Sequence, residues 1–123
     1  MKHALLIFLC VLSSNARAEW IEFSTRSNGD VHFYNNSRVT RDGDEINVWT
    51  RVRYKRSVMA ASSYQRHVQL QCSENTVRIL QDTFFTDKDW TKPAMATNMH
   101  AKPKQAIQHN SATKALAELL CEE

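Results

Sequence analysis

The sequence is poor in glycine and proline, with two of each among 123 residues. Gly29 and Gly43 stand in separate polar turn segments, so the chain has no Gly-rich loop that could cradle a phosphate. It also lacks the Gly-x-Ser-x-Gly motif of serine hydrolases and the His-Glu-x-x-His spacing of zinc enzymes. These absences give no support to a catalytic function. We therefore expect a protein that acts by binding and is not an enzyme.

Long apolar runs are also missing, apart from one near the N-terminus. This run, residues 4–12, is too short to span a bilayer as a helix. It follows a positively charged start and precedes the small residues Ala16 and Ala18, as in a secretory leader. We predict a signal peptide over residues 1–18 and a single domain over residues 19–123; the alternative is an uncleaved membrane anchor.

Net charge is small once the leader is removed. Without Lys2 and Arg17 the chain carries 14 basic and 13 acidic residues, a net charge of +1. This balance predicts no particular partner, and we expect no binding of nucleic acid. Because no second long apolar run follows, the mature chain is not expected to span a membrane.

Cysteine is scarce, and its placement is informative. Cys10 leaves with the leader, so Cys72 and Cys121 remain in the mature domain. In an oxidising compartment two cysteines in a small domain indicate one disulfide. On a chain-entropy model a loop of this length is worth on the order of 4 kcal/mol of stability.

Alternating apolar and polar residues are the main secondary-structure signal. They predict six short strands, at residues 20–24, 31–34, 39–41, 45–55, 64–72 and 76–86. Asp42-Gly43 predicts a tight hairpin turn. Residues 57–63 are predicted as a loop. Residues 87–109 are predicted as a long connection that crosses back over the sheet.

A short amphipathic helix is predicted at the C-terminal end. Ser111 is a good N-cap, and small and apolar side chains then recur at helical spacing. These are Ala112, Ala115, Leu116, Leu119 and Leu120. The fold class is therefore α+β: a six-stranded antiparallel meander with the C-terminal helix packed on one face. Cys72 alternates with Val68 and Leu70, so a disulfide to Cys121 at the helix end is geometrically sensible.

The strand predicted over residues 45–55 carries a basic ribbon. Trp49, Arg51, Arg53 and Lys55 alternate on one side, and Arg56 follows in the predicted loop. No acidic residue lies within residues 46–73. These five residues are the candidate partner-binding site, suited to a sulfated or other anionic glycan, to lipid head groups or to an acidic protein patch. The alternative is a solvated face whose charges discourage aggregation.

The second face of the predicted sheet leaves two interpretations open. In the last predicted strand Val77, Ile79 and Phe85 share one side, while Leu80 and Phe84 share the other with Arg78. A sheet face with Trp49, Leu80 and Phe84 is apolar enough to pack against a second copy as a homodimer, or to be covered by the long connection.

Histidine could supply a ligand site. His100 and His109, in the long connection, could ligate a metal or haem; the alternative is that they are surface residues without a ligand.

The order of these segments resembles the surface-adhesin protein E family. The resemblance rests on the Trp20-led strand, "VHFY", "SRVTRDGDEINVWTRVRY", "VQLQC" before "TVRILQDTFF", and the spacing of Ser111, Leu116 and Cys121. It implies an antiparallel sheet with a C-terminal helix tied to it by a disulfide. It also implies an envelope or surface location in a Gram-negative-type cell.

The resemblance further implies binding of host matrix proteins, and haem binding by a dimer. No cofactor is expected, and the family resemblance keeps haem as the alternative. We expect an exported adhesin-like domain that recognises a host matrix protein or polyanion at the cell surface. The alternative is a periplasmic accessory or structural domain that docks in an envelope assembly or inhibits a partner; the lack of a lipobox favours it slightly.

Overall fold

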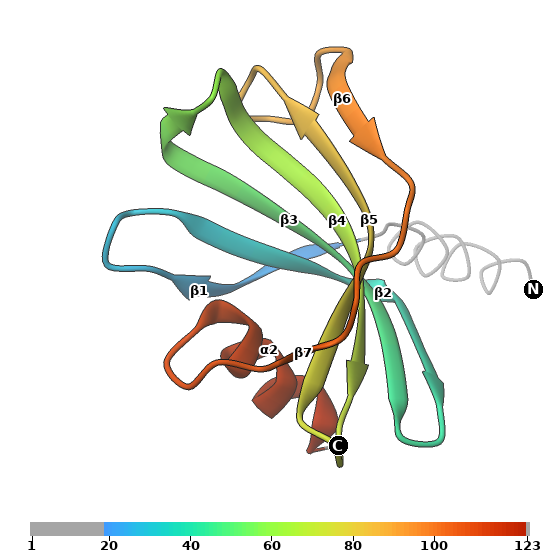
Figure 1. Cartoon of the computed structure of the whole chain (residues 1–123). Coiled ribbons are helices and arrows are strands. Elements are labelled where there is room, and N and C mark those ends of the chain that lie inside the picture. Colours follow the sequence, from blue (N-terminus) through green and yellow to red (C-terminus); the bar gives the residue numbers. More distant parts are fainter. Residues whose placement is uncertain (1–18, 123) are drawn as a thin grey trace, which may run out of the picture.

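A computed structural model describes residues 19–122 (Figure 1). The predicted signal peptide therefore lies outside the described residues. Residues 19–122 form seven strands and one helix. They are β1 (Trp20–Thr25), β2 (Val31–Asp42), β3 (Glu45–Val58), β4 (Ala61–Gln71), β5 (Thr76–Phe85), β6 (Ala94–Asn98), β7 (Gln105–Ala106) and α2 (Ala112–Cys121).

The strands form one antiparallel sheet in meander order. β1 to β6 follow one another as hydrogen-bonded neighbours, and the two-residue β7 also pairs with β5. The helix α2 lies against one face of this twisted sheet (Figure 1). The predicted α+β class, the meander and the single C-terminal helix are confirmed.

Two of the predicted strands are one. Residues 31–34 and 39–41 belong to the continuous strand β2, which bulges between Tyr34 and Val39 opposite β3. Asn35, only 2% exposed, stabilises the bulge because its Oδ1 accepts hydrogen bonds from Ser37 N and Oγ at 3.0 and 2.9 Å. The polar residues 35–37, which separate the two predicted strands, therefore form a bulge inside one strand.

The predicted loop over residues 57–63 is wrong. β3 and β4 continue to a two-residue turn, with Val58 paired to Ala61 and only Met59 and Ala60 between them. The sequence predicts a loop there because most side chains of residues 57–63 are small or hydroxylated. In the structure Ser62 and Ser63 are buried, and the Ser57 and Ser62 hydroxyls hydrogen-bond at 2.8 Å.

Beyond the turn that carries Trp90, the chain between β5 and α2 does not cross a sheet face. It turns back to add β6 and then β7 along the edge of β5 (Figure 1). The two prolines, Pro93 and Pro103, stand just outside these short strands, where a missing N–H costs no ladder hydrogen bond. The prediction of a structureless crossing is therefore replaced by an edge extension.

The core lies between α2 and the sheet. Its buried sheet residues come from one face of β3 and β4, and Leu116, Ala117 and Leu120 supply the helix side. The predicted disulfide joins Cys72 to Cys121. Ser111 is the N-cap, accepting from Lys114 N at 3.1 Å and donating to Gln108 O at 2.8 Å.

A bulge in β5 changes which side chains share a face. His67 pairs with Gln81 and Val68 with Ile79, so Leu80 is the extra residue. Beyond it the alternation reverses, and Phe84 packs near Tyr64 on the helix side. The prediction that Phe84 shares a face with Leu80 is therefore wrong, because a bulge shifts every later side chain to the other face.

Candidate functional site

The strict alternation of β3 separates the core from an outer face. Ile46, Val48 and Val52 point toward α2 and are buried. The outer face therefore carries the intervening residues of β3, including Trp49, Arg51 and Arg53. Together with aromatic rings from other segments they form the aromatic–cationic face, which consists of Trp20, Phe33, Trp49, Arg51, Arg53 and Trp90.

Arg51 lies against two indole rings. Its guanidinium carbon is 4.1 Å from the centroid of Trp20 and 4.8 Å from that of Trp90. Its Nε donates to Gln65 Oε1 at 2.9 Å, across the β3–β4 pair. Burial lowers the pKa of the Arg51 guanidinium, but an arginine still carries its charge at neutral pH. The site thus holds a fixed, partly desolvated cation.

Arg53 lies two residues further along β3, at the next position on the same face, and also contacts aromatic rings. Its guanidinium lies 5.4 Å from the ring centroids of both Phe33 and Trp90. Its Nε donates to Lys88 O at 3.2 Å, and Asp89 lies 3.9 Å away. Trp90 therefore contacts both arginines. Its Nε1 donates a hydrogen bond to Tyr64 O at 3.0 Å, which fixes the position of the ring.

Trp49 forms a separate stack on the same side of β3. Its ring is parallel to that of its cross-strand partner His67, with centroids 4.4 Å apart. The guanidinium of Arg38 lies 5.1 Å from the Trp49 ring. Burial, together with the charge of Arg38, lowers the pKa of His67, so the imidazole is neutral at neutral pH.

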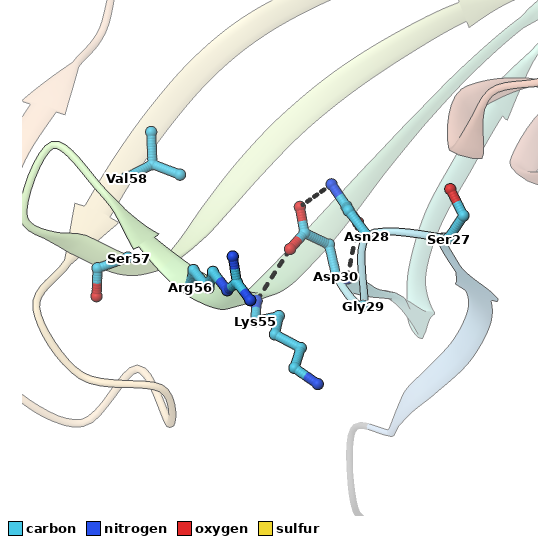
Figure 2. A pocket seen from close by; sticks show the side chains of 8 residues that line it. All are labelled: Ser27, Asn28, Gly29, Asp30, Lys55, Arg56, Ser57 and Val58. Carbon is cyan, nitrogen blue, oxygen red and sulfur yellow. Dashed lines mark hydrogen bonds between the residues drawn. The ribbon is translucent and has the colours of Figure 1, made fainter.

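Lys55 and Arg56 lie apart from these stacks, beside an open hollow (Figure 2). This hollow of about 510 Å³ lies between the β1–β2 turn and the end of β3. Asp30 ties its two sides together, because its carboxylate accepts from Lys55 N at 2.9 Å and from Asn28 Nδ2 at 3.1 Å. Lys55 also packs over Gly29, where a Cβ would meet its Cδ at 2.5 Å.

The predicted ribbon is therefore divided into three parts. Arg51 and Arg53 lie together, Trp49 has its own stack, and Lys55 and Arg56 line the hollow. Sequence reasoning missed the partners Trp20, Phe33 and Trp90. A cross-strand register would have found Phe33, which pairs with Arg51, whereas Trp90 is brought in by a distant turn.

The turn after β5 covers part of the outer face. Trp90 from this turn packs edge-on against Phe33, with ring centroids 5.8 Å apart. This contact supports partial cover by the connection over residues 87–109. Packing against a second copy stays a prediction.

A smaller cavity lies between α2 and the sheet. It measures about 190 Å³ and is lined mainly by apolar residues, with His32, Tyr64 and Arg66 among its polar ones. Arg66 Nε donates to Asp82 in a short contact, and Lys102 Nζ lies 3.4 Å from the same carboxylate. Asp82 is only 2% exposed, so these two cations compensate a buried charge.

Haem is implied by the family resemblance, but the two candidate histidines do not fit it. His100 and His109 are both exposed. His109 lines an open hollow whose other walls are mostly polar, including Arg26 and Glu118. A large apolar ring requires an apolar cleft, so no role is derived for haem. Among residues 19–122, no cluster of three or more His, Cys, Asp or Glu side chains suits a metal ion.

Comparison with solved structures shows the same fold in protein E from Haemophilus influenzae. A second crystal form of that protein matches with a TM-score of 0.68 and 12% identity, covering 89% of this chain and 91% of the other. Another structure of it, from a non-typeable strain, gives a TM-score of 0.64 at 12% identity, covering 89% and 79%. A search of curated proteins finds no match.

A family model named surface-adhesin protein E matches residues 20–122. A surface-adhesin family implies an exported or cell-surface protein. No helix in the described part of the chain is long and apolar enough to cross a membrane. The match covers almost all of the described residues, and the chain belongs to the surface-adhesin protein E family.

Proposed function

We propose that this chain is an exported, non-catalytic adhesin-like domain that binds an anionic partner through its aromatic–cationic face. The partner is a host matrix protein with an acidic patch, or a polyanionic glycan. The observation that carries the proposal is the Arg51 guanidinium held against the Trp20 and Trp90 rings.

The rings reduce the entropic cost of binding. A free arginine side chain loses on the order of 2 kcal/mol of rotamer entropy when it is fixed. Contacts with Trp20, Trp90 and Gln65 already restrict Arg51. An anion that binds this guanidinium therefore meets a preorganised cation.

Arg51 also retains donors for a ligand. Among the described residues its only hydrogen bond uses Nε, so the terminal nitrogens have no protein acceptor there. A guanidinium can bind carboxylate or sulfate oxygens with two parallel hydrogen bonds. Arg53 is less free, because Lys88 O and Asp89 lie beside it.

Lys55 and Arg56 supply further positive potential at the adjoining hollow. Both side chains are exposed, and neither forms an ion pair with another residue of the described range 19–122. Exposed charges of this kind raise the association rate constant with an anionic partner more than they raise the affinity.

Charge reversal tests the proposal. We expect Arg51→Glu/Arg53→Glu to elute from a heparin column at clearly lower salt than the unaltered protein. The matched control is Lys104→Glu/Lys114→Glu, which changes net charge equally but on side chains that pair with Glu74 and Glu118.

The control should shift less than the double variant at the aromatic–cationic face. Equal shifts would mean that bulk charge alone governs retention. Unchanged retention of Arg51→Glu/Arg53→Glu would reject the proposed face.

A further inference from the structure

The β3–β4 hairpin ends in an exposed apolar tip. Met59 is 91% exposed and Val58 48% exposed. A single exposed apolar side chain is ordinary, but two in succession at the end of a hairpin form a small protruding apolar surface. Neither residue contributes to the core cluster of the described chain.

The backbone at this tip is unfavourable for the residues it carries. Met59 and Ala60 both have positive φ, 49° and 72°. Two-residue hairpin turns with positive φ favour Asn-Gly, since L side chains are disfavoured there. Methionine at this position is thus explained neither by packing nor by turn preference, and such outliers point to a function.

The strands below the tip are firmly anchored. Ala61, Ser62 and Ser63 are each no more than 8% exposed. Ser63 Oγ donates to Asp87 O at 2.6 Å, and the Ser57 and Ser62 hydroxyls bond across the hairpin. The tip is therefore presented outward on a well-packed support.

Positive charge follows directly behind the apolar residues. Lys55 and Arg56 line the hollow beside Val58, as Figure 2 shows. Asp30 is the one acidic residue among the described residues that line the hollow, and its carboxylate accepts from Lys55 N and Asn28 Nδ2. Apolar side chains with adjacent cations suit the boundary between acyl chains and anionic headgroups.

We propose that the β3–β4 tip contacts an anionic phospholipid surface, with Met59 and Val58 entering the acyl boundary. Lys55 and Arg56 then face the lipid phosphates. This function goes beyond recognition of a soluble anion at the aromatic–cationic face, because it requires the apolar residues of the tip.

A tryptophan at the tip reports its environment directly. Met59→Trp is mixed at low salt with phosphatidylglycerol vesicles carrying brominated acyl chains. We expect extra quenching of emission relative to the unaltered protein, and none with phosphatidylcholine vesicles. The matched control is Met99→Trp, another exposed methionine at 65%, which should show no extra quenching.

A second variant separates tip chemistry from folding. Met59→Asn/Ala60→Gly suits the positive φ values, so it should melt at a higher temperature. We expect it to co-sediment with phosphatidylglycerol vesicles at least threefold less than the unaltered protein. Co-sedimentation at the unaltered level, or equal quenching of Met59→Trp and Met99→Trp, would overturn the proposal.

Discussion

His32 lies among the residues that line the cavity between α2 and the sheet, next to the Phe23 ring. Its pKa is lowered to about 4, chiefly by burial; Asp30 opposes this shift, whereas Arg26 and Arg66 add to it. An unfolded histidine titrates near its ordinary value of about 6.5. The folded state therefore favours the neutral ring. The contribution of His32 to the free energy of unfolding is fully present above about pH 6.5.

Acid should therefore weaken the fold through His32. As pH falls from about 6.5 toward 4, the unfolded chain takes up a proton that the folded chain resists. We expect a loss of about 1–2 kcal/mol between pH 7 and pH 5, measured by urea unfolding. His32→Gln should largely remove this dependence, and His100→Gln, an exposed site, should keep it. The same pH dependence in His32→Gln would show that other groups cause it.

Ser111 gives a second test at a single residue. Its hydroxyl accepts from Lys114 N and donates to Gln108 O, fixing the start of α2. We expect Ser111→Ala to lower the free energy of unfolding by about 1 kcal/mol. Ser111→Thr keeps the hydroxyl and should restore most of the loss in the same denaturation experiment.

At the scale of elements, α2 is held by packing and by one covalent bond. Leu116 and Leu120 are 2% and 3% exposed, and the Cys72–Cys121 bond closes a separation of 49 residues. Arg41 Nη1 also donates to Leu120 O at 2.8 Å near the helix end. The helix therefore covers one face of the sheet, and the proposed binding residues Arg51 and Arg53 lie on the opposite face.

Removing the disulfide should cost a large part of the stability. Cys72→Ser/Cys121→Ser frees a loop worth on the order of 4 kcal/mol, which corresponds to a melting temperature lower by about 15–30 °C. Thermal denaturation followed by circular dichroism measures the change. A melting temperature equal to that of the unaltered protein would contradict the role assigned to the bond.

Much of the element order could be predicted from the sequence. The alternation of residues 45–55, the Asp42-Gly43 turn and the capped C-terminal stripe are local signals. The bulge at Leu80 was not predictable, because it depends on pairing between two strands. The β6 and β7 strands were missed for the same reason, since they are short, exposed and defined by β5.

At the scale of the molecule, the two sheet faces differ in what lies against them. One is buried under α2, and the other carries arginines fixed on aromatic rings. The sequence predicted that Trp49, Arg51 and Arg53 share a face, because they alternate along a single strand. It could not predict Trp90, which lies 39 residues after Arg51 and reaches it through a turn with positive φ at Trp90 itself, 57°.

We propose that aromatic rings prepare Arg51 and Arg53 for an anionic partner. The decisive measurement is calorimetric titration with heparin that compares Trp90→Ala with Met99→Ala, since both substitutions leave net charge unchanged. We predict that Trp90→Ala weakens binding at least threefold at constant salt, and that Met99→Ala binds like the unaltered protein. Equal affinity of the Trp90→Ala variant and the unaltered protein would contradict the account.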